Sequence, residues 1–407
     1  NKYWKLIKDF NLNLLPSSLS VGSDFVRQFN SQKFRDAGLG AENITIDELI
    51  RRNYTFDFQY TINYDLTDGL RLNFTSSTNN IVRNYFIDDE LNGDQDPELG
   101  VWDRFFDFGD PNRHTQQLGV NYELPLNKFP ALSFVTSNYS YTGDFQWNKG
   151  SDLLVGDGNV SLGNSISNAN QHNLNTSFDM RKLYRYLGIK KSSKRNRAVK
   201  SNANTPSSRA SSKSKKFNLK NLGIGLLTSI NRMQINYSEG NSSFLPGYLP
   251  TPGFLGTLRP TAGYTFGSQR DIRRISAENG WLTTYDQFNQ QYTETHTQDI
   301  DFNINMEPIS DLKIDLTGGK TYATNFTETF NVETNASGLS YNPLIPNTFG
   351  NFNISTVLIK TAFSQSDEIK SVPFEEFKSN RLVIANRLAQ NFYGANGFTT
   401  DPEGYPE

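Results

Sequence analysis

The chain has no cysteine and only 3 methionines among its 407 residues. Without cysteine, disulfides and thiolate chemistry are both excluded. No window approaches the roughly eighteen consecutive apolar residues of a transmembrane helix. The strands of a membrane barrel alternate between apolar and polar residues and leave no such hydropathy peak, so a β-type membrane protein stays possible. The formal net charge of -2 gives no support for a nucleic-acid partner.

Aromatic residues are abundant: 30 Phe and 19 Tyr bring the aromatic share to 13%. They stand in a polar chain that is rich in Asn and Thr, where a soluble core of this size would draw more on Leu, Ile, Val and Ala. This combination favours a two-faced sheet with lipid on one side and water on the other. The chain opens at Asn1 with neither a start Met nor a signal peptide, which suggests an internal piece of a longer protein.

Period-two alternation is clearest in residues 54–64, where every even position is aromatic or Ile and every odd position is polar. About ten tilted residues of this kind span a hydrocarbon layer. The Asp68-Gly69 pair then predicts a hairpin, after which the pattern resumes. Similar units surround residues 118–147 and 300–316, and the total is about nine strands. A slip of the apolar phase predicts a β-bulge within 135–137.

The alternation assigns side chains to two faces of a membrane-spanning sheet. The predicted lipid-facing residues are Tyr54, Phe56, Phe58, Tyr60, Ile62, Tyr64, Ile300, Phe302 and Ile304. The predicted lumen-facing residues are Asp57, Gln59, Thr61, Asn63, Arg71, Asn73, Thr75, Asp299, Asp301, Asn303 and Asn305. The lumen-facing set is short, polar and of mixed charge, which suits a wide, water-filled barrel better than a small filled one.

Short and long connections alternate along residues 1–363, the part expected to form the barrel wall. The short ones, predicted as periplasmic turns, are 65–69, 125–130 and 307–311. The long ones, predicted as extracellular loops, are 30–52, 81–113, 148–169, 239–293 and 331–349. This arrangement is typical of outer-membrane barrels, which have an even number of strands, so about nine strands would be part of a larger barrel. Residues 364–407 form a separate extracellular region with a helix that Ser371 could cap.

A basic, low-complexity segment at 181–216 interrupts the strands on the expected periplasmic side. It contains no acidic residue, and residues 190–216 contain no aromatic ring on which a nucleic-acid base could stack. The segment is interpreted either as a solvated tether or as a docking arm for an anionic surface or a periplasmic partner.

Few residues suggest chemistry. His114, His172 and His296 lie far apart, and no metal-ligand spacing or catalytic triad is present, so the chain is not expected to be an enzyme or to hold a cofactor. A weak Ca²⁺ candidate has Leu99 where a bidentate Glu belongs, so a hydrated acidic loop is the default interpretation. Its potential oxygen ligands are Asp88, Glu90, Asn92, Asp94 and Asp96.

The run from Trp4 to Ser20, W-K-L-I-K-D-F-N-L-N-L-L-P-S-S-L-S, resembles a phrase of the SprA/Sov family, the giant outer-membrane translocons of type IX secretion in Bacteroidetes. In that family the phrase leads from a periplasmic turn into a strand that ends near Arg-x-Phe-Asn, here Arg27 to Asn30. The aromatic hairpin at 54–74 and the Trp102-Asp103-Arg104-Phe105 loop are also similar. The likeness is specific in the first thirty or so residues.

The resemblance implies a barrel of up to 36 strands that exports folded proteins bearing a C-terminal secretion domain, gliding adhesins among them, to the cell surface. It also implies a PorV-type shuttle barrel, a plug protein and a periplasmic peptidyl-prolyl isomerase as partners, besides the lipids of the bacterial outer membrane. Two other barrels share the strand pattern: a TonB-dependent-type nutrient transporter of about 22 strands, and a surface adhesin whose loops bind and whose lumen is filled.

Overall fold

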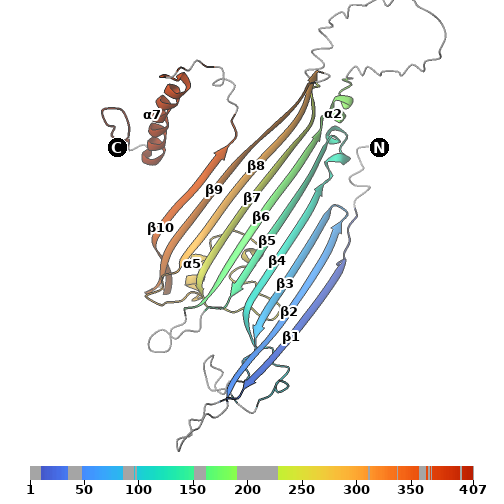
Figure 1. Ribbon diagram of the computed structural model, residues 1–407, viewed down its shortest axis with the longest axis vertical. Coiled ribbons are helices and arrows are strands. Elements are labelled where there is room, and N and C mark those ends of the chain that lie inside the picture. The colour runs from blue at the N-terminus through green and yellow to red at the C-terminus, as the bar shows by residue number, and fades with distance from the viewer. Residues whose placement is uncertain are drawn as a thin grey trace, which may run out of the picture. The chain divides into compact units, whose positions relative to one another are not determined.

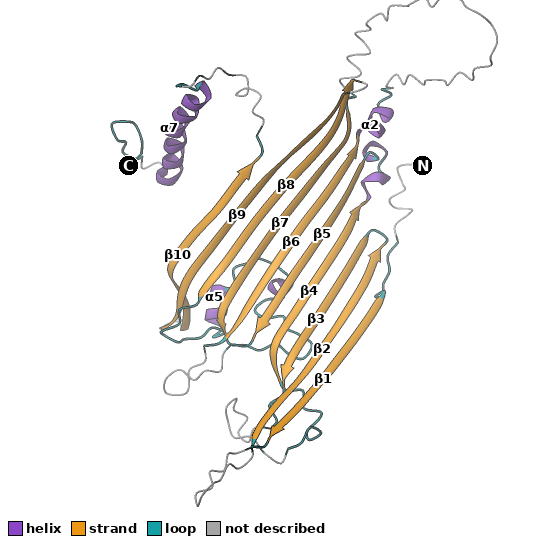
Figure 2. Cartoon of the chain, in the orientation of Figure 1, coloured by secondary structure: helices purple, strands orange, loops and turns teal. Residues whose placement is uncertain are grey.

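A computed structural model describes residues 11–34, 48–85, 96, 99–150, 162–189, 228–309, 312–336, 338–356, 364, 367, 369–394 and 397–406. Most of these residues form one antiparallel sheet of ten strands in sequence order (Figures 1 and 2). The strands are β1 (Ser18–Gln32), β2 (Leu49–Thr67), β3 (Leu70–Ile81), β4 (Asp110–Leu124), β5 (Val135–Asn148), β6 (Asn164–Asp179), β7 (Ile230–Tyr248), β8 (Gln291–Ile309), β9 (Leu312–Asn335) and β10 (Gly338–Ile354). The all-β prediction is confirmed, and the described sheet is open, with β1 and β10 at its edges.

The tenth strand, β10, is a correction to the predicted count and to the predicted loop at 331–349. β9 continues to Asn335, and β10 folds back onto it from Gly338. Pro343 and Pro346 obscure the alternation of this stretch, but proline is tolerated both at the edge of the described sheet and at a bulge. The register shifts between Pro343 and Ile345. Since ten strands are described, the odd-count argument for a larger barrel loses its basis.

The connections define two ends of the sheet. The turn end carries the connection at 68–69, the short 3-10 helices η2 (Pro125–Lys128) and η3 (Pro130–Leu132), and the connection between β8 and β9. The loop end carries four long connections and the two-residue connection between β9 and β10, and all are shorter than predicted because the strands run further. The largest correction is at 239–293, where strands occupy both flanks and leave 249–290, here called the cap loop.

The bulge predicted at 135–137 is absent from the pairing of β5. Its register with β4 and with β6 continues without a shift from Ser137 to Asn148. The apparent slip arises because Leu132 lies in η3 and Phe134 precedes the strand. β5 therefore begins at Val135 and keeps a single apolar phase at its odd positions.

Packed side chains concentrate at the loop end. The larger cluster joins the cap loop, including its helices α4 (Ala262–Thr265) and α5 (Arg273–Glu278), to strands β5 to β9. Its buried members include Phe145, Trp147, Tyr264, Ile272 and Phe330. A smaller cluster holds Tyr54, Phe56, Val82 and Tyr85.

Residues 355–407 form a second compact unit. Its main element is helix α7 (Val372–Tyr393), which starts after Ser371 as the sequence predicts and ends at Gly394, where φ is +59°. Among the described residues, no helix is long and apolar enough to cross a bilayer. The basic segment 181–216 begins within helix α2 (Met180–Tyr186), and from residue 190 onward it lies outside the described residues.

Candidate functional site

The strand registers place all the predicted lumen-facing side chains on one face of the sheet, here called the polar face. One continuous row of paired residues crosses it from β3 to β8: Arg71, Asn121, Ser140, Asn173, Ser238 and Asp299. Since directly paired residues of neighbouring strands share a face, residues more than two hundred positions apart line the same surface.

Side chains on the polar face bond sideways to their neighbours across the strands. The Asn73 amide donates to Asn63 Oδ1 at 2.5 Å, and Thr61 and Thr75 hydroxyls lie 3.1 Å apart. Further along, Asn79 donates to Asp57 and Gln117 to Asp144, each at 2.7 Å. Because carboxylates of the polar face already accept hydrogen bonds from donors of the same face, they bind a passing polypeptide less strongly.

The opposite face, here called the aromatic face, carries the predicted lipid-facing side chains. Toward the turn end its residues are apolar from strand to strand and form the apolar band. Members of the band include Ile62 and Tyr64 in β2, Leu72 and Phe74 in β3, Leu118, Val120 and Tyr122 in β4, Tyr139 and Tyr141 in β5, Leu174 in β6, Ile235 and Tyr237 in β7, and Ile300, Phe302 and Ile304 in β8. The two faces therefore differ in polarity over most of the turn-end half of β2 to β8, apart from the hydrogen-bonded pair Ser137 and Thr176. In β9, Gly318 and Lys320 lie on the aromatic face opposite Phe302 and Ile300.

The apolar band runs obliquely to the rows of paired residues. In β4 the band starts at Leu118. The row of paired residues that contains Leu118 continues through Gly143, Asn170 and Asn241 to His296 of β8. In β8 the band starts only at Ile300, four positions nearer the turn end. This shift falls between β4 and β6, because Ile62, Phe74 and Leu118 share one row and Leu174, Tyr237 and Ile300 share another. Averaged over the six strand steps from β2 to β8, it is about 0.7 residue per strand, or about 2.2 Å along the strand for about 4.8 Å across. The band is thus horizontal when the strands tilt by about 25°.

The cap loop covers the loop-end half of the aromatic face. Phe254 packs on Phe58 with 4.4 Å between ring centroids, and Tyr60 Oη donates to the Leu255 carbonyl at 2.7 Å. Tyr54 and Phe56 are each 2% exposed, because the side chains of Val82, Tyr85, Leu99, Phe108 and Phe254 pack against them. The alternation predicts lipid contact for these two side chains, but the chain's own loops cover them.

Polar residues beneath the cap loop bond to its backbone. The Asn168 amide donates to the carbonyls of Tyr264 and Ser268, at 3.0 and 2.8 Å, and the Asn170 amide donates to Gly267 O at 2.6 Å. Trp147 Nε1 donates to Pro250 O at 3.0 Å. The backbone groups of a loop that lies on a sheet need such hydrogen-bond partners. This need explains why polar residues occupy strand positions whose neighbours on the same face are apolar.

Arg273 of α5 connects the cap loop to β8, β9 and β10. Its guanidinium bonds to Asp271 and to Glu328, and lies 4.6 Å from the centre of the Tyr292 ring. Tyr341 Oη donates to Glu328 Oε1 at 2.6 Å. Sequence reasoning missed this site, although one signal was present: Glu328 occupies an apolar phase between Phe326 and Phe330, where a carboxylate requires a buried partner.

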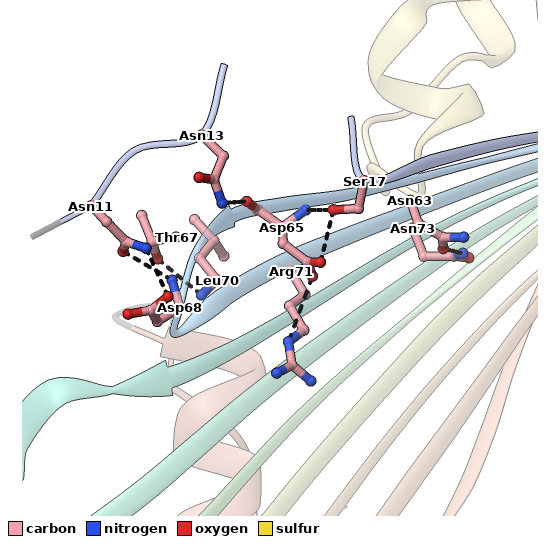
Figure 3. A network of polar contacts seen from close by, with 10 residues as sticks. All are labelled: Asn11, Asn13, Ser17, Asn63, Asp65, Thr67, Asp68, Leu70, Arg71 and Asn73. Carbon is pink, nitrogen blue, oxygen red and sulfur yellow. Dashed lines mark hydrogen bonds and ion pairs between the residues drawn. The ribbon is translucent and has the colours of Figure 1, made fainter. Parts of the chain in front are cut away.

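At the turn end, residues 11–17, part of the run from Trp4 to Ser20, hydrogen-bond to the β2–β3 hairpin (Figure 3). These contacts are here called the clamp. The Asn11 amide donates to Asp68 Oδ1, and the Asn13 amide to the Asp65 carbonyl, each at 2.7 Å. Ser17 Oγ donates to Asp65 Oδ2 at 2.7 Å and accepts from Asp65 N at 3.0 Å. The polar residues of the phrase therefore hold the register between segment 11–17 and the hairpin.

No cofactor or metal site emerges among the described residues, where no group of three or more His, Asp or Glu lies together. Of the weak Ca²⁺ candidate only Asp96 is described, and Asp88, Glu90, Asn92 and Asp94 lie outside. His114 Nδ1 lies 2.7 Å from the Thr78 hydroxyl, and His172 Nδ1 lies 2.7 Å from the Tyr139 hydroxyl. His172 also pairs in register with Glu239, whose Oε1 lies 3.9 Å from His296 Nδ1, and His296 bonds to Asn241.

Comparison with known proteins yields no match, either to a protein-family model or to a curated protein.

Proposed function

We propose that this chain forms part of the wall of a large outer-membrane β-barrel that conducts proteins to the cell surface. The observation that carries the membrane part of the proposal is the oblique apolar band opposite a polar face. A sheet that stands in a bilayer with tilted strands needs a band stepped in this way, whereas a soluble sandwich has no reason for it. The polar face would then line water, and the loop end would lie outside the cell.

The character of the polar face supports a wide conduit. Its side chains are mainly Asn, Ser, Thr and Gln, with Asp57, Arg71 and Asp299 adding charges of both signs. Small barrels fill their interior with bulky side chains, while large ones leave room for water. A lining without a patch of one sign would let a folded protein pass without trapping it.

The proposal that the barrel exports proteins rests on the resemblance of residues 4–20 to the SprA/Sov family, together with the position of residues 11–17 at the turn end. Under this proposal the substrates are folded proteins with a C-terminal secretion domain. A PorV-type shuttle, a plug protein and a periplasmic isomerase would be partners. A nutrient transporter shares the strand pattern, and chain size distinguishes the two.

The first test is the intact mass, under denaturing conditions, of the polypeptide that carries these residues in the outer-membrane fraction. At about 40 to 45 residues per strand, a 36-strand wall needs about 160 to 180 kDa and a 22-strand wall about 100 to 110 kDa. A mass of about 160 kDa or more supports the translocon. A mass near 110 kDa contradicts it and favours the transporter.

The second test is depletion of the protein in the organism that makes it. We expect proteins with C-terminal secretion domains to disappear from the surface and to accumulate in the periplasm, while other outer-membrane proteins keep their levels. Unchanged surface display of those proteins would contradict the export function and leave a transporter or an adhesin.

A further inference from the structure

Two loops from different parts of the chain carry strongly exposed apolar side chains. Trp102 and Phe106, in the connection between β3 and β4, are 79% and 81% exposed. Leu255 and Leu258 of the cap loop are 64% and 61% exposed. Apolar groups that cluster on a surface without cover usually mark a contact with a partner or a membrane.

The first of these loops is held firmly by the sheet. Arg27 Nη2 donates to Phe105 O at 3.1 Å, and Phe105 stacks on Phe25 of β1 with 5.3 Å between centroids. Arg104 Nη1 donates to the Asn84 carbonyl and the Asn84 amide to the Arg104 carbonyl, each at 3.1 Å. The exposure of Trp102 and Phe106 is therefore a feature of residues 99–108, which these contacts fix against the sheet.

Both loops lie against the aromatic face, and the cap loop borders the apolar band. Leu255 is joined through its carbonyl to Tyr60, whose next neighbour on that face is Ile62 of the band. Further along the cap loop, Phe266 lies 5.8 Å from Phe74, also a band residue. Phe105 stacks on Phe25, which pairs with Phe56, nearer the loop end than the band. The loop that carries Trp102 and Phe106 therefore reaches the cap loop through Phe108, whose ring centroid lies 6.1 Å from that of Phe254.

We propose that Trp102, Phe106, Leu255 and Leu258 form an interfacial collar that inserts into the headgroup layer of the outer leaflet. The partner is a lipid surface, and the continuity of the collar with the apolar band favours it over a protein. The inference rests on the proposed membrane position of the sheet. Arg259, exposed beside Leu258 and 5.8 Å from the Trp281 ring, supplies a cation for anionic lipid phosphates.

These 407 residues contain no cysteine, so a single introduced cysteine is the only spin-label site among them. The complete polypeptide that carries them, with any cysteine elsewhere replaced by serine, is reconstituted in bilayers that contain anionic lipid. Collisions of the label with oxygen and with a water-soluble nickel chelate report its depth. The collar variants are Phe106→Cys and Leu258→Cys. The controls are Glu278→Cys on the exposed end of α5, Phe302→Cys in the apolar band and Asn303→Cys beside it on the polar face.

We expect the two collar labels to lie at headgroup depth, with nickel collisions several-fold fewer than at Glu278→Cys and oxygen collisions fewer than at Phe302→Cys. Nickel access equal to that of Glu278→Cys would overturn the collar. Low access to both reagents would also overturn it and indicate protein contact. If the nickel chelate reaches the labels at Phe302→Cys and Asn303→Cys equally, the proposed membrane position of the sheet is wrong. If the label at Phe302→Cys lies deep in the bilayer but the collar labels are exposed to water, only the collar is wrong.

Discussion

Arg273 Nη1 lies 2.8 Å from Glu328 Oε1, and this ion pair joins helix α5 of the cap loop to strand β9. The two side chains are 19% and 7% exposed. The rings of Tyr292, Phe326 and Tyr341 lie within 5.7 Å of the guanidinium carbon, so aromatic faces surround the charge. A charge pair so enclosed is costly to break from one side, because the remaining partner stays buried without compensation.

Replacement of Arg273 should therefore release the cap loop. We expect Arg273→Met to reduce the free energy of cap-loop opening by about 3 kcal/mol, because Glu328 keeps its charge in a buried site. Hydrogen exchange of the amides of residues 262–280 measures this opening. Arg274→Met, at the exposed neighbouring position, is the control and should leave exchange unchanged. Equal protection in the two variants would contradict the anchoring role.

The carboxylate of Asp271 should make the cap loop sensitive to acid. Burial raises the pKa of this group, but hydrogen bonds and charge from Arg273 outweigh burial, and the pKa lies below its ordinary value of 3.8. The contribution to stability is therefore complete above the ordinary carboxyl pKa and is lost as pH falls through the lowered value. Cap-loop protection followed from pH 6 to about pH 2 should fall less in Asp271→Asn than in the unchanged chain. Identical acid profiles would contradict this role.

Gly256 lies where the cap loop crosses β4. Its φ is +121°, and a Cβ atom there would stand 2.1 Å from Gln116 Nε2. Gly256→Ala should displace the Gln116 amide, the movable end of a buried side chain, and cost about 1 kcal/mol in opening free energy from backbone strain and repacking. Gly338→Ala is a matched control, since its φ is +117° and nothing lies within 4 Å. The same hydrogen-exchange measurement on both variants separates the clash with Gln116 from backbone strain. Equal losses of protection in Gly256→Ala and Gly338→Ala would argue against a close contact at Gly256.

Adjacent positions in β8 should respond oppositely to charge. Phe302 belongs to the apolar band and Asn303 to the polar face. If the band faces lipid, Phe302→Arg costs about 2–4 kcal/mol near the bilayer midplane, whereas Asn303→Arg faces water and is tolerated. The readout is the fraction of protein that assembles in the outer membrane as a heat-resistant folded form. Equal assembly of the two variants would contradict a lipid-facing band.

The clamp at the turn end should contribute modestly to local stability, because its side chains are exposed to solvent. Ser17→Ala removes both hydrogen bonds to Asp65 and should cost about 1 kcal/mol in local stability. Amide exchange at residues 65–70 measures the loss. Ser20→Ala, an exposed serine further along β1, is the control. Faster exchange in both variants alike would show that serine content, rather than the clamp, matters.

Alternation alone predicts much of the sheet. In β2 the polar phase of Asp57 and Gln59 and the aromatic phase of Phe58 and Tyr60 fall on opposite faces, since side chains of a strand alternate by geometry. The hairpin at Asp68-Gly69 follows from turn chemistry in the same local way. The edge strand β10 was missed, because Pro343 and Pro346 obscure its alternation and edge position becomes apparent only once β9 is beside it.

The sequence by itself determined the strands of most of the sheet and the phase of their side chains, because both depend on residues a few positions apart. Only the tertiary structure decided which parts of the aromatic face the chain covers. Tyr60 meets Leu255 across 195 positions, and Arg273 meets Glu328 across 55. The burial of Tyr54 and Phe56, unlike their alternation, comes from loops that return to the strand from elsewhere. Local periodicity carries no information on such long-range packing.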